Sequence, residues 1–129
     1  KEINKVNNTE LDWNKWRNLA LTDGSVYYFA VYSGEQLVGE IFLHDIDWNK
    51  KVSLVGYHLF NAQNRGRGVG TKALQLLQQY VRRETSLKEL TIITNQDNIP
   101  SRKIAEKCGF IYTGSSREDA QRVVYEWKI

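Results

Sequence analysis

The chain has 129 residues, of which 41% are hydrophobic and 26% charged, values typical of one folded globular domain and not of a disordered protein. It contains no apolar run near the ~20 residues that a membrane helix needs and no recognisable secretory leader, which argues against membrane and secreted proteins. The single cysteine, Cys108, cannot form an internal disulfide, so we expect a cytoplasmic protein.

The net charge of +3 is unevenly spread along the chain. Residues 1–60 carry six Lys or Arg against eight Asp or Glu, whereas residues 61–108 carry nine against four. The cationic segment indicates an anionic ligand there, and the acidic first part would suit a cationic one. A chance drift of charge over solvated helix faces explains the same pattern equally well.

The first half of the chain predicts one helix followed by three strands. Residues 9–12 (Thr-Glu-Leu-Asp) resemble a capping box, and apolar residues at helical spacing follow, which predicts a helix over 10–21. Aromatic and β-branched residues predict strands over 25–32 and 37–43, joined as a hairpin. A polar turn follows from Asp45, and 52–60 is the third predicted strand.

The second half alternates helices and strands. Apolar residues at helical spacing predict a helix over 69–83, and 90–94 is a short buried strand. A second helix over 98–109 has an asparagine N-cap, a proline in its first turn and a terminal glycine. Two closing strands follow, at 110–113 and 123–129. This order predicts one α/β domain over 1–129, with a mixed, largely antiparallel sheet flanked by helices. The strand–helix–strand run also predicts that the strands at 52–60 and 88–95 are parallel and splay apart beyond Phe60.

A glycine-rich loop lies between the third strand and the helix over 69–83. Its sequence, residues 65–71, is Arg-Gly-Arg-Gly-Val-Gly-Thr. Glycines at alternate positions leave the backbone N–H groups unobstructed, and the helix N-terminus adds a positive dipole, so the loop suits a pyrophosphate. The dinucleotide fingerprint is excluded because Thr71 stands where its third glycine belongs, and no Gly-Lys-Ser/Thr is present. A tight strand-to-helix turn is the structural alternative.

This loop resembles the coenzyme-binding motif of the GNAT superfamily of N-acetyltransferases, Gln/Arg-x-x-Gly-x-Gly/Ala, which is met by Arg65, Gly68 and Gly70. The segment 98–110 resembles the family's second block, an asparagine-led helix that ends in Gly-Phe. The resemblance covers about residues 25–129 and is closest to enzymes that act on ribosomal-protein N-termini or on small polyamines. It implies an N-acetyltransferase with acetyl-CoA as co-substrate.

The resemblance also implies a set of coenzyme contacts. The pyrophosphate would be held by the loop amides, with nearby arginine charge; these residues are Arg65, Gly66, Arg67, Gly68, Val69, Gly70 and Thr71. The pantetheine arm would pair with the backbone of Leu59, Phe60 and Asn61 by strand addition. Asn98 would face the same arm or serve as a plain helix cap, and Arg102 or Lys103 would approach the ribose phosphate.

The resemblance implies direct attack of a primary amine on the thioester in a ternary complex, and here the sequence departs from the family pattern. The family's usual tyrosine acid is Ala105, so Ser101 on the same helix is the candidate donor to the leaving sulfur. The usual glutamate base falls at Leu54, and His58, of the same strand parity, is the candidate base. The carboxylates that would act through a water instead are Glu40, Asp45 and Asp47.

Three function classes remain for comparison. An acetyl-CoA:amine N-acetyltransferase leads, and a coenzyme A-binding domain without turnover is the alternative because two usual catalytic positions are changed. A nucleic-acid-binding domain is disfavoured, since no such motif is present. We expect no metal site, no membrane partner and either a monomer or a homodimer. The family fold begins with a strand, and residues 1–6 are short and polar, so we expect that strand to be truncated or missing.

Overall fold

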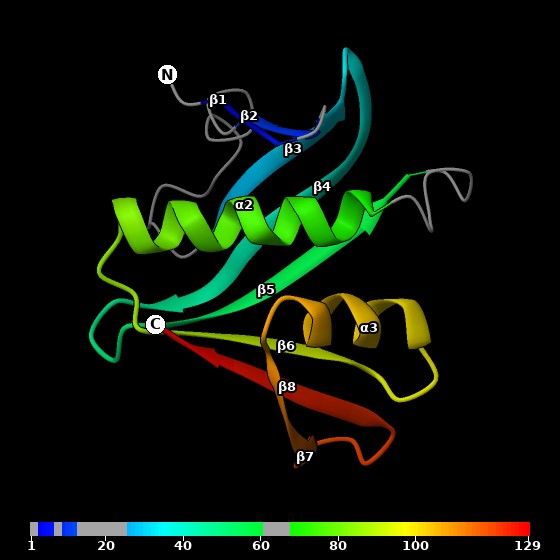
Figure 1. Cartoon of the computed structure of the whole chain (residues 1–129). Coiled ribbons are helices and arrows are strands. Elements are labelled where there is room, and N and C mark those ends of the chain that lie inside the picture. The colour runs from blue at the N-terminus through cyan, green and yellow to red at the C-terminus, as the bar shows by residue number, and fades with distance from the viewer. Residues whose placement is uncertain (1–2, 7–8, 13–25, 61–67) are drawn as a thin grey trace.

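A computed structural model describes residues 3–6, 9–12, 26–60 and 68–129 of the chain, with side chains described from residue 26 on. Within these residues, eight strands form one sheet in the order β1-β2-β3-β4-β5-β6-β8-β7, and two helices accompany it (Figure 1). Neighbouring strands are antiparallel except for the parallel pair β5–β6, so the predicted fold class is confirmed. The elements are β1 Ile3–Val6, β2 Thr9–Asp12, β3 Tyr27–Ser33, β4 Gln36–Asp47, β5 Val52–Leu59, α2 Val69–Glu84, β6 Glu89–Asn95, α3 Ile99–Lys107, β7 Ile111–Ser115 and β8 Arg122–Lys128.

The N-terminal segment differs from the sequence prediction. Thr9–Asp12 forms β2 and not the start of a helix over 10–21, and the rest of that predicted helix lies outside the described residues. Ile3–Val6 forms β1, so the first strand is not missing. β2 pairs with β1 on one side and β3 on the other, and this pairing satisfies backbone groups that a helix would otherwise use. Long-range pairing therefore overrides the local capping signal.

The second difference concerns the end of β4. A turn was expected from Asp45, but β4 continues to Asp47, with the turn after it. Asp45 adopts a left-handed φ of 51°, and the register with β5 shifts between His44 and Asp47. A bulge thus absorbs the polar residues that the sequence analysis took for the turn itself.

The core lies between the sheet and the two helices. α2 contacts β1, β2 and β4, α3 contacts β6 and β7, and the helices contact each other. Large side chains that are fully or almost fully buried join the layers: Phe29, Leu74, Leu77, Leu90 and Tyr125. Cys108, at the end of α3, is buried as predicted, and burial raises the pKa of its thiol to about 11. Among the described residues, no helix is long and apolar enough to cross a membrane.

The parallel strands β5 and β6 separate early. They pair at only three positions, the last of which joins Leu54 to Thr91, although β5 continues to Leu59 and β6 to Asn95. Figure 1 shows the two strands diverging toward the end of the molecule where α2 begins and α3 lies. The predicted parallel, splayed arrangement is confirmed, but the separation begins after Leu54 and not beyond Phe60.

Candidate functional site

A cavity of about 560 Å³ lies at the separation of β5 and β6. Three elements line it, namely the end of β5, the start of α2 and one face of α3. The lining residues are Tyr57, His58, Leu59, Gly68, Val69, Gly70, Thr71, Asn98, Ile99, Pro100, Ser101, Lys103, Ile104 and Lys107. Asn61, Arg65, Gly66 and Arg67, which were also assigned to the coenzyme, lie outside the described residues.

Two glycines shape the wall where α2 begins. Gly68 is the N-cap, with φ 78° and ψ 6°, a left-handed conformation that side chains disfavour. Gly70 faces α3, where an added Cβ would lie 2.7 Å from Ile104 Cδ1. The first helical hydrogen bond is donated by Lys72 N to Gly68 O, so the preceding first-turn amides remain for a ligand. With no acidic residue in the first turn, this end of the helix suits an anion.

The free edge of β5 can serve an extended ligand. Phe60 N donates to Val38 O at 2.9 Å, so this amide is turned toward β4. Because peptide groups alternate along a strand, those of Tyr57 and Leu59 point the other way, toward β6. Pairing with β6 has ended at Leu54. The peptide groups of Tyr57 and Leu59 therefore face the side where β6 has separated, whereas the N–H of Phe60 is already bonded to β4.

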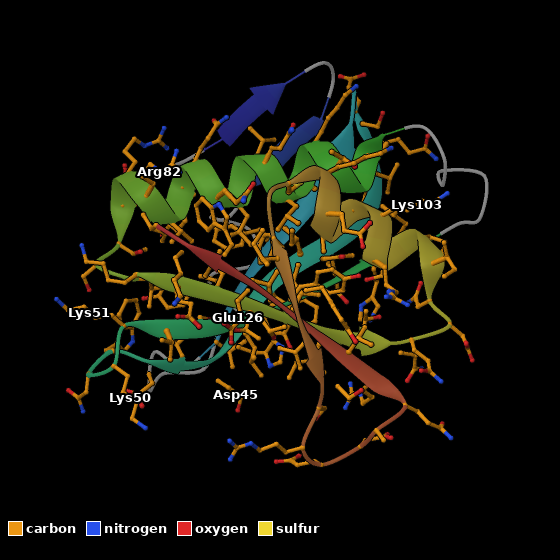
Figure 2. The ribbon with its side chains drawn as sticks, turned by 60° about the horizontal axis from the view of Figure 1, so that its bottom comes forward. Asp45, Lys50, Lys51, Arg82, Lys103 and Glu126 are labelled. Carbon is orange, nitrogen blue, oxygen red and sulfur yellow. The ribbon has the colours of Figure 1, made fainter. Side chains whose placement is uncertain are left out.

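The helix-cap interpretation of Asn98 is confirmed, since its Oδ1 accepts from Ser101 N at 3.2 Å. Arg102 does not line the cavity. Its Nε donates to Tyr125 Oη and its Nη1 to Gln96 O, each at 3.0 Å. Lys103 lines the cavity, together with Lys107. Figure 2 shows Lys103 on α3 near the start of α2, far from Asp45.

A second cavity, of about 570 Å³, adjoins the first. It is lined by parts of β4, β5 and β6, by the start of α3, by Glu118 and by the first residue of β8. The lining residues are Phe42, His44, Asp45, Leu54, Val55, Gly56, Tyr57, His58, Ile92, Ile93, Thr94, Asn98, Ser101, Glu118 and Arg122. A Cβ on Gly56 would lie 2.5 Å from the Phe42 ring, so glycine lets this ring lie close to β5. Both cavities share Tyr57, His58, Asn98 and Ser101, which stand where the two spaces meet.

His58 pairs with Glu40 at this junction. The two residues are cross-strand partners of β5 and β4, and His58 Nδ1 lies 3.0 Å from Glu40 Oε2. The His58 side chain is 64% exposed and that of Glu40 22% exposed. When Nδ1–H donates to the carboxylate, Nε2 is left as a proton acceptor. The two alternative bases of the sequence analysis thus form one pair.

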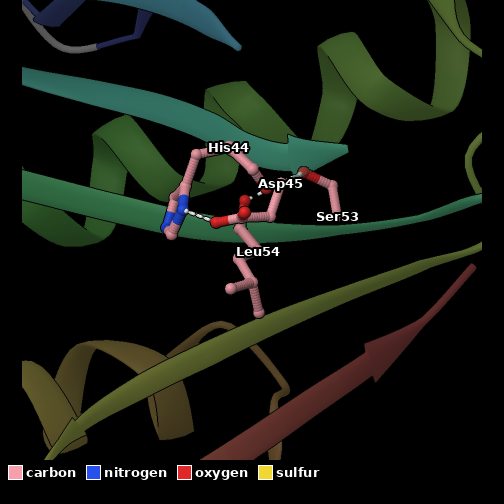
Figure 3. A network of polar contacts seen from close by, with 4 residues as sticks. All are labelled: His44, Asp45, Ser53 and Leu54. Carbon is pink, nitrogen blue, oxygen red and sulfur yellow. Dashed lines mark hydrogen bonds and ion pairs between the residues drawn. The ribbon is translucent and has the colours of Figure 1, made fainter. Parts of the chain in front are cut away.

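The other two candidate carboxylates have local partners. Asp45 Oδ2 lies 2.7 Å from His44 Nδ1, and the Ser53 hydroxyl on β5 donates to the His44 carbonyl (Figure 3). Asp47 accepts from Lys50 N at 2.9 Å within the turn and lines neither cavity. Across the ranges with described side chains, no group of three or more His, Cys, Asp or Glu could hold a metal ion.

A family model described as "Acetyltransferase (GNAT) domain" matches residues 4–111 of the chain. The chain belongs to the GNAT acetyltransferase family. Among curated proteins, the "Probable N-acetyltransferase YjcK" of Bacillus subtilis (strain 168) is 29% identical over 98 residues, which are 74% of this chain and 54% of that protein. The ribosomal-protein-serine acetyltransferase of Escherichia coli (strain K12) is 27% identical over 95 residues, covering 74% of this chain and 52% of that protein. The chain therefore spans about half the length of these relatives.

Among solved structures, the ribosomal L7/L12 α-N-protein acetyltransferase RimL, in complex with coenzyme A, superposes with a TM-score of 0.82. The alignment covers 99% of this chain and 98% of RimL at 18% identity. At this identity the likeness establishes the fold that the GNAT model had indicated.

The residue at the usual tyrosine position of the GNAT family and the serine predicted to act in its place lie in different surroundings. Ala105, at the usual tyrosine position, is fully buried in the core. Ser101 lies on the first turn of α3, and its Oγ is 3.0 Å from Tyr57 Oη, which also donates to Ser101 O at 3.1 Å. Burial raises the pKa of Tyr57 to about 12. Tyr57 was not predicted from the sequence. The signal was available, because a tyrosine on the face of a strand that packs against helices needs a hydrogen-bond partner for its hydroxyl.

Proposed function

We propose that this GNAT domain transfers the acetyl group of acetyl-CoA to a primary amine by direct attack in a ternary complex. The observation that carries the proposal is the meeting of two cavities at the separation of β5 and β6. One cavity has the start of a helix and two lysines in its wall, and the other opens beside a histidine–carboxylate pair. The names of the relatives support acetyl transfer as the reaction.

In this proposal the first cavity holds the coenzyme. The first-turn amides of α2, including those of Val69, Gly70 and Thr71, bind the pyrophosphate. The edge of β5 at Leu59 pairs with the amides of the pantetheine arm, and Asn98 lies beside it. Lys103, in place of Arg102, supplies charge for the ribose phosphate. The arm then ends where the two cavities meet.

The second cavity then holds the amine. An ammonium group must lose a proton before it can attack, and His58 Nε2, oriented by Glu40, accepts that proton. The nitrogen forms a bond to the acetyl carbon, the carbon–sulfur bond breaks, and the electron pair passes to sulfur. The proton that the nitrogen loses as it becomes an amide passes through water to the coenzyme thiolate, so the products are the N-acetylated amine and the coenzyme A thiol. Ser101 Oγ donates a hydrogen bond to the sulfur as negative charge develops on it. No covalent intermediate on the protein is needed.

The acceptor is the amine of a protein N-terminus or of a small polyamine-like compound. The curated ribosomal-protein acetyltransferase supports the first, and the carboxylates of Asp45 and Glu118 in the second cavity would suit the second. A thiol-release assay with acetyl-CoA and a panel of N-terminal peptides, their N-blocked forms and polyamines separates these acceptors. Release that needs a free amine supports transfer, and mass spectrometry of the product identifies the acetylated nitrogen.

The alternative, coenzyme binding without turnover, rests on the changed positions Leu54 and Ala105. Binding of coenzyme A in calorimetry with no thiol release from any acceptor in the panel would favour it. Gly68→Asp is the control for the site, because it adds a carboxylate and left-handed strain at the α2 N-cap and should abolish coenzyme binding. Unchanged coenzyme affinity in this variant would contradict the loop assignment.

A further inference from the structure

Tyr57 and Ser101 connect β5 with α3, two of the elements that line the first cavity. Tyr57 lies on β5 beyond its last pair with β6, and Ser101 lies on the first turn of α3. The phenol oxygen is 3.0 Å from Ser101 Oγ and 3.1 Å from Ser101 O, and both residues line both cavities. The tyrosine hydroxyl therefore contacts Ser101, the proposed hydrogen-bond donor to the coenzyme sulfur.

The protons of this pair allow two arrangements. A tyrosine hydroxyl has one hydrogen, and here two acceptors lie within reach of it. When Tyr57 donates to Ser101 O, the Ser101 hydroxyl can donate back to Tyr57 Oη, and its hydrogen points away from the cavity. When Tyr57 donates to Ser101 Oγ, the Ser101 hydrogen is free to point into the cavity.

We propose that Tyr57 is a positioning residue that acts through Ser101, by donating to Ser101 Oγ and so turning the serine hydrogen toward the coenzyme sulfur. This inference rests on the proposed function, because it needs coenzyme A in the first cavity. It goes beyond that function because it assigns a role to Tyr57 on β5 in addition to the donor, Ser101, on α3. The family's usual tyrosine position, Ala105, is buried and has no hydroxyl to offer.

The chemistry requires only hydrogen bonds from this pair. The carbon–sulfur bond breaks with its electron pair on sulfur. Because the thiolate is the conjugate base of a thiol of pKa about 8.5, it is a far weaker base than a serine alkoxide and does not take the serine proton outright. Tyr57, whose pKa burial raises to about 12, keeps its proton throughout the neutral range and remains a donor. Hydrogen bonds in a chain strengthen one another, so the phenol increases the donation by serine.

The thiol pKa of bound coenzyme A measures the effect of the Tyr57–Ser101 hydrogen bonds, and this measurement needs no amine acceptor. A hydrogen bond to the thiolate favours the charged form and lowers the pKa of the thiol, which ultraviolet absorbance of the thiolate measures. We expect bound coenzyme A to have a lower thiol pKa than free coenzyme A. Tyr57→Phe and Ser101→Ala should each raise it toward the free value, and the double variant should raise it no further than Ser101→Ala. His58, Lys103 and Lys107 also line the cavity and stay unchanged in every variant.

Acetyl transfer gives a second readout. Tyr57→Phe should lower kcat about tenfold, the low end for a hydrogen bond to a charged group, with coenzyme affinity within about twofold of wild type. The matched control is Tyr125→Phe, which removes another phenol that donates to α3, at Glu106 Oε2 and 2.8 Å, outside both cavities. This control should lose stability while the thiol pKa and kcat stay at wild-type values.

Two results would overturn the inference while leaving the proposed function intact. One is a wild-type thiol pKa and kcat in Tyr57→Phe. The other is additive effects of Tyr57→Phe and Ser101→Ala in the double variant, which would mean that the two hydroxyls act independently. Failure of the wild type to bind coenzyme A would instead overturn the proposed function, and this inference with it.

Discussion

His58 and Glu40 face each other because β4 and β5 pair in a particular register. Glu40 is the direct partner of His58, and Phe42 is the partner of Gly56 two positions along. Side chains at alternate positions share one face of a sheet, so Glu40, Phe42 and His58 all lie on the side away from Tyr57. The centroids of the Phe42 and His58 rings are 5.8 Å apart, and both rings line the second cavity. The histidine is thus held by a carboxylate on one ring nitrogen and by a neighbouring aromatic ring.

The first prediction concerns this pair. His58→Gln should lower kcat about 10²-fold, the low end for a positioned base, and should leave coenzyme affinity unchanged. Glu40→Gln should have a smaller effect, because the amide oxygen can still accept from His58 Nδ1.

The matched control for Glu40→Gln is Asp47→Asn, which makes the same chemical change on the same strand, at a carboxylate that accepts from Lys50 N in the turn and does not contact His58. It should retain wild-type turnover. Wild-type rates at every pH in both His58→Gln and Glu40→Gln would show that the amine loses its proton to another group, and that positioning of the reactants dominates the rate.

For single residues, the sequence indicated which side chains lie at the site better than it indicated which side chains they contact. His58 and Ser101 were found from strand parity and from their places in the motifs, and both lie where the cavities meet. The pairing with Glu40 depends on the register that the 48–51 turn and the bulge set, which no local pattern encodes. Arg102 does not line the first cavity, because neighbouring helical positions point in different directions and its guanidinium reaches Tyr125.

The contact between α2 and α3 forms one wall of the coenzyme cavity. Gly70 lets Ile104 approach the first turn of α2, and Gln78 Nε2 donates to Cys108 O at 2.9 Å farther along. Cys108 Sγ lies 3.5 Å from Thr71 O, at the same interface. The glycines of the loop therefore have separate tasks, since Gly68 supplies a left-handed turn and Gly70 a close helix contact.

The second prediction tests the task of Gly70. Gly70→Ala should lower the free energy of unfolding by no more than about 1 kcal/mol, because its Cβ meets Ile104 Cδ1 at 2.7 Å and the end of this partly buried side chain can turn aside. It should also weaken coenzyme binding, because the α2 N-terminus shifts relative to α3. Adding Ile104→Val removes the Cδ1 atom and should recover much of both losses in urea unfolding and calorimetry. No recovery in the double variant would mean that Gly70 is needed for phosphate approach alone.

The third prediction separates the two roles of Asn98. Asn98→Ala removes the acceptor for Ser101 N and should cost about 1 kcal/mol of stability. Asn98→Ser keeps an N-cap but shortens the side chain, so it should restore stability and not coenzyme affinity if the amide also contacts the pantetheine arm. Equal coenzyme affinity in Asn98→Ser and wild type would leave Asn98 with the cap role only.

Elements defined by local signals were predicted well. α2 and α3 follow from helical periodicity, an asparagine cap and Gly109, which adopts a left-handed φ of 85° after α3. β2 was predicted as a helix because its capping-box pattern is local, whereas its pairing with β1 and β3 is long-range. The splay of β5 and β6 was predicted from topology, but its start after Leu54 depends on how α3 packs beside the strands.

The whole sheet consists of two parts joined by few bonds. Among the described residues, β1 to β5 form one part and β6, β8 and β7 the other. They are joined by three residue pairs of β5 and β6 and by the backbone hydrogen bond that Lys88 N donates to Lys51 O. The helices supply much of the remaining connection through their mutual contact and through the Tyr57–Ser101 bond. Cys108 and Tyr57, whose ionisable groups are held neutral by burial, both lie against α3. The joint between the two parts is therefore sensitive to high pH.

The last prediction is a loss of stability in alkaline solution. Burial raises the pKa of Cys108 from its ordinary 9.0 to about 11, and that of Tyr57 from 10.0 to about 12. Both groups are neutral when protonated, so the folded state binds their protons more tightly than the unfolded state does. Their stabilising effect is complete below the ordinary pKa and is lost as pH rises through the folded value. For Cys108 this window lies between about pH 9 and pH 11.

Urea unfolding of wild type and Cys108→Ala across this window isolates the thiol. Alanine leaves a small cavity, so the variant should be less stable than wild type at pH 8, and the difference should shrink as pH rises. The other ionisable side chains are common to both proteins and cancel in the comparison, except for Tyr57, whose pKa is also raised by the charge of Cys108. A difference that stays constant from pH 8 to pH 11 would mean that the thiol ionises as readily in the folded state as in the unfolded state. The α2–α3 interface would then admit a thiolate at Cys108. Any loss of stability at high pH would have to come from Tyr57, which contacts α3 from β5.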